Sequence, residues 1–153
     1  KAQIQAGAQI IGIGDAAASL INDSLYREFA LPYERLEVEA IREMGAYTRL
    51  HICGNATHHL EAMRELGVDM VDIDCLTDIS QVREKMGEDV TVMGNLDPVS
   101  VLKNGTPEDV WTSMEKCHWI VGKRFIVGPG CEVAPGTPEE NLRVMMEYAR
   151  SQS

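Results

Sequence analysis

Residues 44–53, with the sequence MGAYTRLHIC, decide the fold class, because a helix ends there in glycine and an apolar strand begins soon afterwards. Glycine supplies the left-handed residue that commonly ends a helix. The same succession of helix, glycine and short apolar run occurs four more times, at Gly7, Gly67, Gly87 and Gly122. Five such joints predict an α/β fold whose short parallel strands are separated by helices.

The predicted elements follow from these joints and from helix-capping patterns. Strands are expected over residues 9–14, 48–53, 70–74, 90–94 and 124–128. Helices are expected over residues 23–29, 34–44 and 57–66, and two more open at the capping-box patterns Thr106-Pro107-Glu108-Asp109 and Thr137-Pro138-Glu139-Glu140. No linker or low-complexity stretch interrupts the pattern, so residues 1–153 are predicted to form a single domain.

The length of 153 residues fits one domain, whereas a complete (β/α)8 barrel needs about 250 residues, with about 200 near the lower limit. The N-terminus resembles the tail of a helix, with neither a starting Met nor an N-cap residue. The polar end Ser151-Gln152-Ser153 resembles a natural C-terminus. We therefore expect a chain that begins within a fold.

The charge balance limits the partners of the protein. The formal net charge is −10, which disfavours nucleic acids and anionic membranes. No apolar run approaches about 18 residues, and no signal peptide is evident, so a cytoplasmic protein is expected. In such a reducing compartment the cysteines at 53, 75, 117 and 131 are interpreted as free thiols or metal ligands rather than disulfides.

Chemically distinctive residues follow the carboxyl ends of the predicted strands, where parallel α/β folds form their sites. His51 and Cys53 are two residues apart on one strand, so their side chains project from the same face. Cys131 follows a glycine-rich end of another strand. One histidine and two thiolates make a known catalytic zinc set with an open fourth position. The alternative is a core histidine beside cysteines that serve only as packing.

Three segments follow the ends of predicted strands: HICGN at 51–55, GNLDP at 94–98 and GPGCEV at 128–133. Together they resemble the C-terminal half of the uroporphyrinogen decarboxylase superfamily, and most of all its zinc-dependent corrinoid:thiol methyltransferases of the coenzyme M type. The resemblance covers the whole chain and implies about five βα units, the C-terminal portion of a (β/α)8 barrel without its N-terminal strands. The decarboxylases carry a histidine in a Gly-His-Gly setting near the last strand, and this chain has Gly128-Pro129-Gly130-Cys131 there.

The resemblance strengthens the prediction that zinc is held by His51, Cys53 and Cys131, which are also the expected catalytic residues. It implies an acidic fourth ligand one strand later, where Asp74 fits, with Cys75 as a competitor and Asp72 as a lesser candidate. Asp15 and Asn95 are the expected cofactor- or substrate-binding residues. Asp15 could instead cap the segment that follows it.

The implied function is transfer of a methyl group from a methylated corrinoid protein to a zinc-bound thiol similar to coenzyme M. The corrinoid is expected on a partner protein, because the chain has no Asp-x-His-x-x-Gly corrinoid motif. Three alternatives are a metal-free decarboxylase, an inactive half-barrel fragment, and an unrelated open α/β binding domain. A homodimer is a further expectation, since a second copy could complete the barrel wall.

Other conspicuous side chains receive structural roles. Cys117 is predicted to pack inside the protein, and most methionines are assigned to the core. Asp97 is predicted to cap a helix. His58 and His59 are predicted to be solvated on a surface helix.

Overall fold

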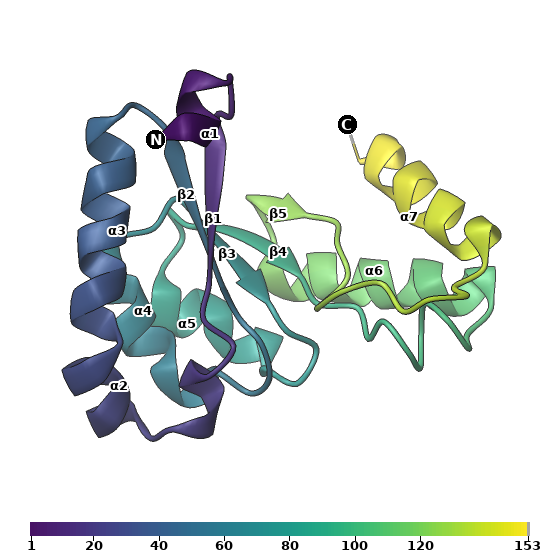
Figure 1. Ribbon diagram of the computed structural model, residues 1–153. Coiled ribbons are helices and arrows are strands. Elements are labelled where there is room, and N and C mark those ends of the chain that lie inside the picture. The colour runs from purple at the N-terminus through teal and green to yellow at the C-terminus, as the bar shows by residue number, and fades with distance from the viewer. Residues whose placement is uncertain (153) are drawn as a thin grey trace.

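The computed structural model describes residues 1–152, which form one sheet flanked by helices (Figure 1). The strands are β1 (Ile10–Gly14), β2 (Tyr47–Ile52), β3 (Met70–Ile73), β4 (Thr91–Gly94) and β5 (Phe125–Ile126). The helices are α1 (Ala2–Gln5), α2 (Asp23–Phe29), α3 (Leu31–Glu43), α4 (Leu60–Leu66), α5 (Val82–Met86), α6 (Pro107–Val121) and α7 (Glu139–Ser151). Short 3-10 helices precede α2, α4 and α5, at Ala18–Leu20, Thr57–His59 and Ile79–Gln81.

The strands are parallel, and their order in the sheet, β1-β2-β3-β4-β5, is their order in the chain. Gly14, His51 and Asp72 lie side by side in this register, close to the carboxyl ends of β1, β2 and β3. Helices separate the strands along the chain, so the predicted succession of βα units is confirmed.

The two faces of the sheet have different environments. Thr48, Leu50 and Ile52 of β2 are buried, together with Val71 and Ile73 of β3. They pack against α3, α4 and α5, which lie side by side along one face of the sheet (Figure 1). The alternating positions of β2 and β3, among them His51 and Asp72, are only half-buried. One face therefore supplies the core, and the other presents polar side chains.

Most element boundaries agree with the prediction to within one residue, and larger departures have local reasons. Helix α3 begins at Leu31 rather than residue 34, because Pro32 is accommodated in its first turn. Strand β5 is shorter than predicted, and Arg124 just before it has a φ of 58°, outside the extended region. The capping box predicted at Thr137 is absent, because the Thr137 hydroxyl donates instead to the Ala134 carbonyl at 2.7 Å. The capping box at Thr106 and Asp109 is confirmed.

Helices α6 and α7 form a second core at the opposite end of the molecule from α2 and α3 (Figure 1). Met114 and Cys117 are buried there, as predicted, and the ring of Trp111 meets that of Tyr148 edge-on at 5.2 Å. Met146 is 46% exposed, so the assignment of methionines to the core does not hold for it. Within residues 1–152, no helix is both long and apolar enough to cross a membrane.

Candidate metal centre

The end of β2 and the loop after β5 bring one imidazole and two thiols together. His51 Nε2 lies 3.1 Å from Cys53 Sγ. Cys131 Sγ lies 3.9 Å from Cys53 Sγ and 3.9 Å from His51 Nε2. Among residues 1–152, they form the one group of three or more histidine, cysteine or acidic residues whose ligand atoms all lie within 4.8 Å of one another.

A hydrogen bond on the side of the His51 ring away from the thiols fixes its orientation. Its Nδ1–H donates to the backbone carbonyl of Asp72 at 2.9 Å. The other nitrogen, Nε2, is therefore left without a proton in the neutral ring, with its lone pair directed at the two thiols. Metal-binding histidines commonly have their second nitrogen held by such a carbonyl.

The separations of the three atoms fit a zinc ion. Bonds of about 2.3 Å to sulfur and about 2.0–2.1 Å to nitrogen, at tetrahedral angles, place two sulfurs about 3.8 Å apart and a sulfur and a nitrogen about 3.6 Å apart. The two distances of 3.9 Å lie near these values, and the 3.1 Å between His51 Nε2 and Cys53 Sγ is about 0.5 Å shorter than the ideal sulfur–nitrogen separation. The donor set of one imidazole and two thiols, with its atoms within 4.8 Å of one another, therefore fits a zinc ion.

The electrostatic environment of the thiols favours a cation. Burial raises the pKa of Cys53, and the neighbouring Cys131 thiol and the carboxylates of Asp74 and Asp72 raise it further. Burial also raises the pKa of Asp72, although His51 and Arg49 oppose it. Without a cation, the Cys53 thiol therefore keeps its proton, whereas a divalent ion would offset the unfavourable charge of the thiolate.

A hollow of about 500 Å³ adjoins the three ligands on the polar face of the sheet. Gly12 and Gly14 of β1 line it without side chains, and Arg49 and Asp72 add charged groups. The cluster is therefore accessible to a small molecule from this side.

The fourth predicted ligand, Asp74, lies outside the group of three. It is 5% exposed, and its Oδ1 accepts a hydrogen bond from the backbone of Leu76 at 2.9 Å. Cys75 also lies outside the group, and burial together with nearby carboxylates raises its pKa to about 11. The identity of the fourth ligand stays a prediction.

Asp15 and Asn95 make local hydrogen bonds. Asp15 Oδ1 accepts from the backbone N–H of Ala18 at 3.2 Å, the type of bond expected from the capping alternative. The amide nitrogen of Asn95 donates to the carbonyls of Asp74 and Thr77, and Asn95 lines a smaller hollow of about 290 Å³. Their predicted role in cofactor or substrate binding stays a prediction.

Asp97 caps a turn rather than the predicted helix, because no helix begins between β4 and α6. Its Oδ1 accepts hydrogen bonds from the backbone N–H groups of Val99 and Ser100, both at 2.8 Å. The side chain of Ser100 and these backbone bonds lower the pKa of Asp97, and the backbone bonds hold the turn that follows β4.

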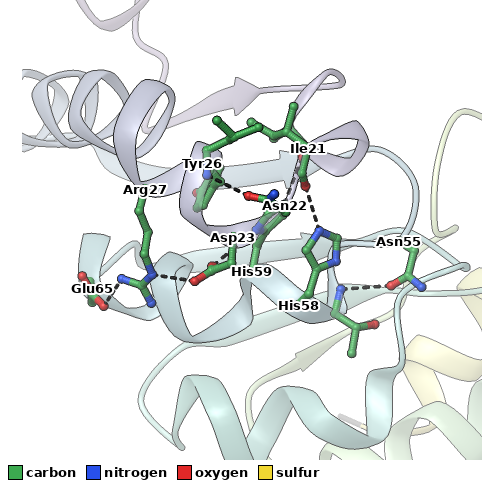
Figure 2. Close-up of polar contacts among 12 residues, drawn as sticks. Ile21, Asn22, Asp23, Tyr26, Arg27, Asn55, His58, His59 and Glu65 are labelled. Atoms are coloured by element: carbon green, nitrogen blue, oxygen red, sulfur yellow. Dashed lines mark hydrogen bonds and ion pairs between the residues drawn. The ribbon is translucent and has the colours of Figure 1, made fainter.

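The prediction that two solvated histidines lie on a surface helix is wrong for His59 and correct for His58 (Figure 2). His59 is fully buried, and its Nε2–H donates to the carbonyl of Ala18 at 3.0 Å. Residues 57–59 form a 3-10 helix and α2 covers them, so His59 turns inward against Tyr26, whose ring centroid is 4.4 Å away. His58 is exposed, with Nε2 3.0 Å from the carbonyl of Ile21.

A buried carboxyl group near His59 was not predicted. The hydroxyl of Tyr26 donates to Glu34, which is 4% exposed. Burial raises the pKa of Glu34 to about 7, with help from the charges of Asp15 and Glu37 and against the Tyr26 hydrogen bond. The signal lies in the helix pattern, because Glu34 occupies a position of the apolar stripe otherwise formed by Leu31, Val38 and Ile41.

Comparison with known proteins links the chain to one family. The model of the uroporphyrinogen decarboxylase (URO-D) family matches residues 1–152. The methylcobamide:CoM methyltransferase MtbA of Methanosarcina acetivorans is 40% identical over 99% of this chain and 44% of its own length. A methylated-thiol–coenzyme M methyltransferase of Methanosarcina mazei is 37% identical over 98% of this chain and 40% of its own. A uroporphyrinogen decarboxylase of Prochlorococcus marinus is 34% identical over 97% of this chain and 42% of its own.

A solved structure shares the fold. A methyltransferase from Methanosarcina mazei superposes with a TM-score of 0.88 at 24% identity, over 99% of this chain and 44% of that one. The prediction of a partial barrel of the uroporphyrinogen decarboxylase type is thereby confirmed. The chain spans less than half the length of the relatives it matches.

Proposed function

The chain belongs to the uroporphyrinogen decarboxylase family, and on that premise we propose that it is the metal-binding part of a methyltransferase. In this proposal, His51, Cys53 and Cys131 hold zinc, and a methyl group passes from a methylated corrinoid protein to a thiol similar to coenzyme M. The proposal is carried by the approach of one imidazole nitrogen and two thiol sulfurs to within 3.9 Å of one another. The names of two relatives, which refer to methylcobamide, methylated thiols and coenzyme M, support the reaction class.

The residues of this chain would perform three tasks. The Asp72 carbonyl holds His51 so that Nε2 faces the site, and the two loops present Cys53 and Cys131 from either side. The adjoining hollow gives a small thiol access to the same point. Zinc held there would stabilise the substrate sulfur as a thiolate near neutral pH and would contribute no redox chemistry.

We propose Asp74 as the fourth ligand. Its carboxylate is buried and close enough to Cys53 to raise the pKa of that thiol. A cation between them would offset both the cost of burying the Asp74 carboxylate and the cost of ionising the Cys53 thiol. Cys75 is the competing candidate, because it follows Asp74 directly on the same turn.

The first test is metal binding by the purified chain, since its relatives are more than twice as long as the segment they share with it. We expect one zinc per chain, and we expect Cys53→Ala and Cys131→Ala to lose it. Cys117→Ala is the matched control, because that thiol is buried in the second core. Equal zinc content in all four proteins would end the proposal. Porphyrinogen turnover in EDTA by the full-length protein would favour the decarboxylase instead.

A further inference from the structure

We propose that Thr77 and Asn95 are positioning residues for the metal centre. They fasten the turn of residues 74–77, called the brace turn below, to the loop that follows Cys53. The brace turn also packs against the loop that carries Cys131. This inference deepens the proposed function and rests on it, because it concerns how the two cysteine ligands are kept at the right separation.

Thr77 fastens the brace turn to the loop after Cys53. Its side chain is almost fully buried, at 3% exposure for the residue. Its hydroxyl donates to the carbonyl of Gly54 at 2.9 Å and accepts from the backbone N–H of Ala56 at 2.9 Å. Gly54 follows Cys53 directly, and its φ of 86° requires glycine there. One hydroxyl therefore fixes both ends of the bend that directs the Cys53 thiol.

Asn95 holds the brace turn from the next strand. Its amide nitrogen donates to the carbonyl of Asp74 at 3.2 Å and to that of Thr77 at 3.0 Å, so both of its hydrogens are used. These two bonds orient the amide, and its oxygen accepts only a weak hydrogen bond from the Cys117 thiol at 3.6 Å. The two ends of the turn are thus held at a constant distance from the end of β4.

The opposite side of the brace turn touches the loop that carries Cys131. A Cβ atom at Gly130 would lie 2.4 Å from the backbone nitrogen of Cys75 and 2.9 Å from its Cα atom, so the two backbones are in direct contact. The N–H of Gly130 also donates to the carbonyl of Leu96 at 2.7 Å. Any shift of the brace turn would therefore displace Cys131 relative to Cys53.

The energetic consequence should appear in metal affinity. Zinc ligands must lie within about 0.2 Å of their ideal distances, and loss of a residue that orients ligands typically weakens metal binding about 10- to 100-fold. Thr77→Val keeps the shape of the side chain but leaves the Gly54 carbonyl and the Ala56 N–H without a partner. We expect a weaker metal site in which all three ligands are still present.

The chain offers a closely matched control in Thr48. That residue is fully buried, and its hydroxyl donates to Asp69 at 2.7 Å and accepts from the backbone N–H of Asp69 at 3.1 Å. It lies near the start of β2, whereas His51 and Cys53 lie at the other end of that strand. Thr48→Val thus removes an equivalent pair of hydrogen bonds away from the site.

The test is titration of the chain with Co²⁺ and Zn²⁺, followed through the thiolate-to-cobalt absorption bands, with circular dichroism as the measure of folding. We expect Thr77→Val to bind about 10- to 100-fold more weakly with altered cobalt bands, Thr77→Ser to recover the wild-type affinity, and Thr48→Val to match wild type. If Thr77→Val does not fold, Asn95→Ala provides the same comparison.

The outcomes separate the two proposals. A wild-type chain that binds neither metal would overturn the proposed function and this inference with it. A wild-type chain that binds metal normally, with Thr77→Val unchanged in affinity and spectrum, would overturn the inference alone. Equal weakening in Thr77→Val and Thr48→Val would also overturn it, because general destabilisation would then explain the loss.

Discussion

His51 and His59 lie eight residues apart, and a backbone carbonyl binds one ring nitrogen of each. His51 nevertheless lies at the candidate metal centre, whereas His59 is buried in the core. Each donates one ring N–H to a backbone carbonyl, at 2.9 Å to Asp72 and at 3.0 Å to Ala18. The second nitrogen of His51 faces two thiols beside an open hollow. That of His59 lies in a fully buried setting, 3.5 Å from a carboxylate oxygen of Asp23.

The comparison shows what makes a histidine available for chemistry. In both cases a backbone carbonyl binds one ring nitrogen, so that bond alone does not distinguish a site from a core. The difference is the partner of the remaining nitrogen and its access to solvent. Soft thiols at the end of a strand suit a metal ion, whereas a ring enclosed by Tyr26 and Asp23 suits the joining of α2 to the 3-10 helix at residues 57–59.

The largest expected effect is the loss of metal binding in His51→Ala. About 10–16 kcal/mol of binding free energy is shared among four ligands in structural zinc sites, so removal of one should weaken zinc binding about 100- to 1,000-fold. Competition with a chromophoric chelator measures the affinity. Unchanged affinity would mean that the imidazole is not a ligand.

His59→Ala should produce the opposite pattern, a loss of stability without a loss of metal. Removal of a fully buried ring leaves a cavity and an unpaired Ala18 carbonyl, which together should lower the free energy of unfolding by about 3–4 kcal/mol. Urea denaturation gives the stability, and zinc content at low temperature gives the metal. Loss of zinc from a folded His59→Ala chain would contradict the division of roles between the two histidines.

Glu34 should make the buried region near His59 sensitive to pH. Its pKa of about 7 in the folded protein lies above the ordinary value of 4.5, so the folded state binds more protons between these values. Wild-type stability should therefore fall as the pH rises from about 4.5 to 7, by about 2–3 kcal/mol, and the loss should be complete above pH 7. Glu34→Gln should remove this loss. The free energy of unfolding of both proteins, measured at pH 5 and pH 8, checks this prediction. If wild type and Glu34→Gln differ in stability by the same amount at both pH values, the prediction is contradicted.

The smallest expected effect belongs to Asp74. If Asp74 is the fourth ligand, Asp74→Asn should weaken zinc binding about 10-fold, less than removal of the imidazole. Cys75→Ser is the comparison, and it should leave the affinity unchanged. The reverse result would identify Cys75 as the fourth ligand.

Local sequence rules account for the parts of the structure that were predicted. Glycine at helix ends identified the βα joints, and strand alternation placed His51 and Cys53 on one face. Cys131 was predicted to join them because parallel strands end at a common edge.

The unpredicted features depend on distant neighbours. His59 is buried because α2 covers the 3-10 helix at residues 57–59, and Glu34 is tolerated on an apolar stripe because Tyr26 donates to it from another helix. The hydrogen bonds of Asn95 to the brace turn likewise join residues that are 18 and 21 positions apart. Such pairings follow from tertiary packing and leave no periodic signal in the sequence.

X-ray absorption at the zinc edge of the zinc-loaded chain tests the central claim most directly. We expect two sulfur ligands at about 2.3 Å and an imidazole nitrogen at about 2.0–2.1 Å, with one sulfur lost in Cys131→Ala. A first shell made only of oxygen and nitrogen, or a spectrum that Cys131→Ala leaves unchanged, would contradict the claim that His51, Cys53 and Cys131 form a metal centre.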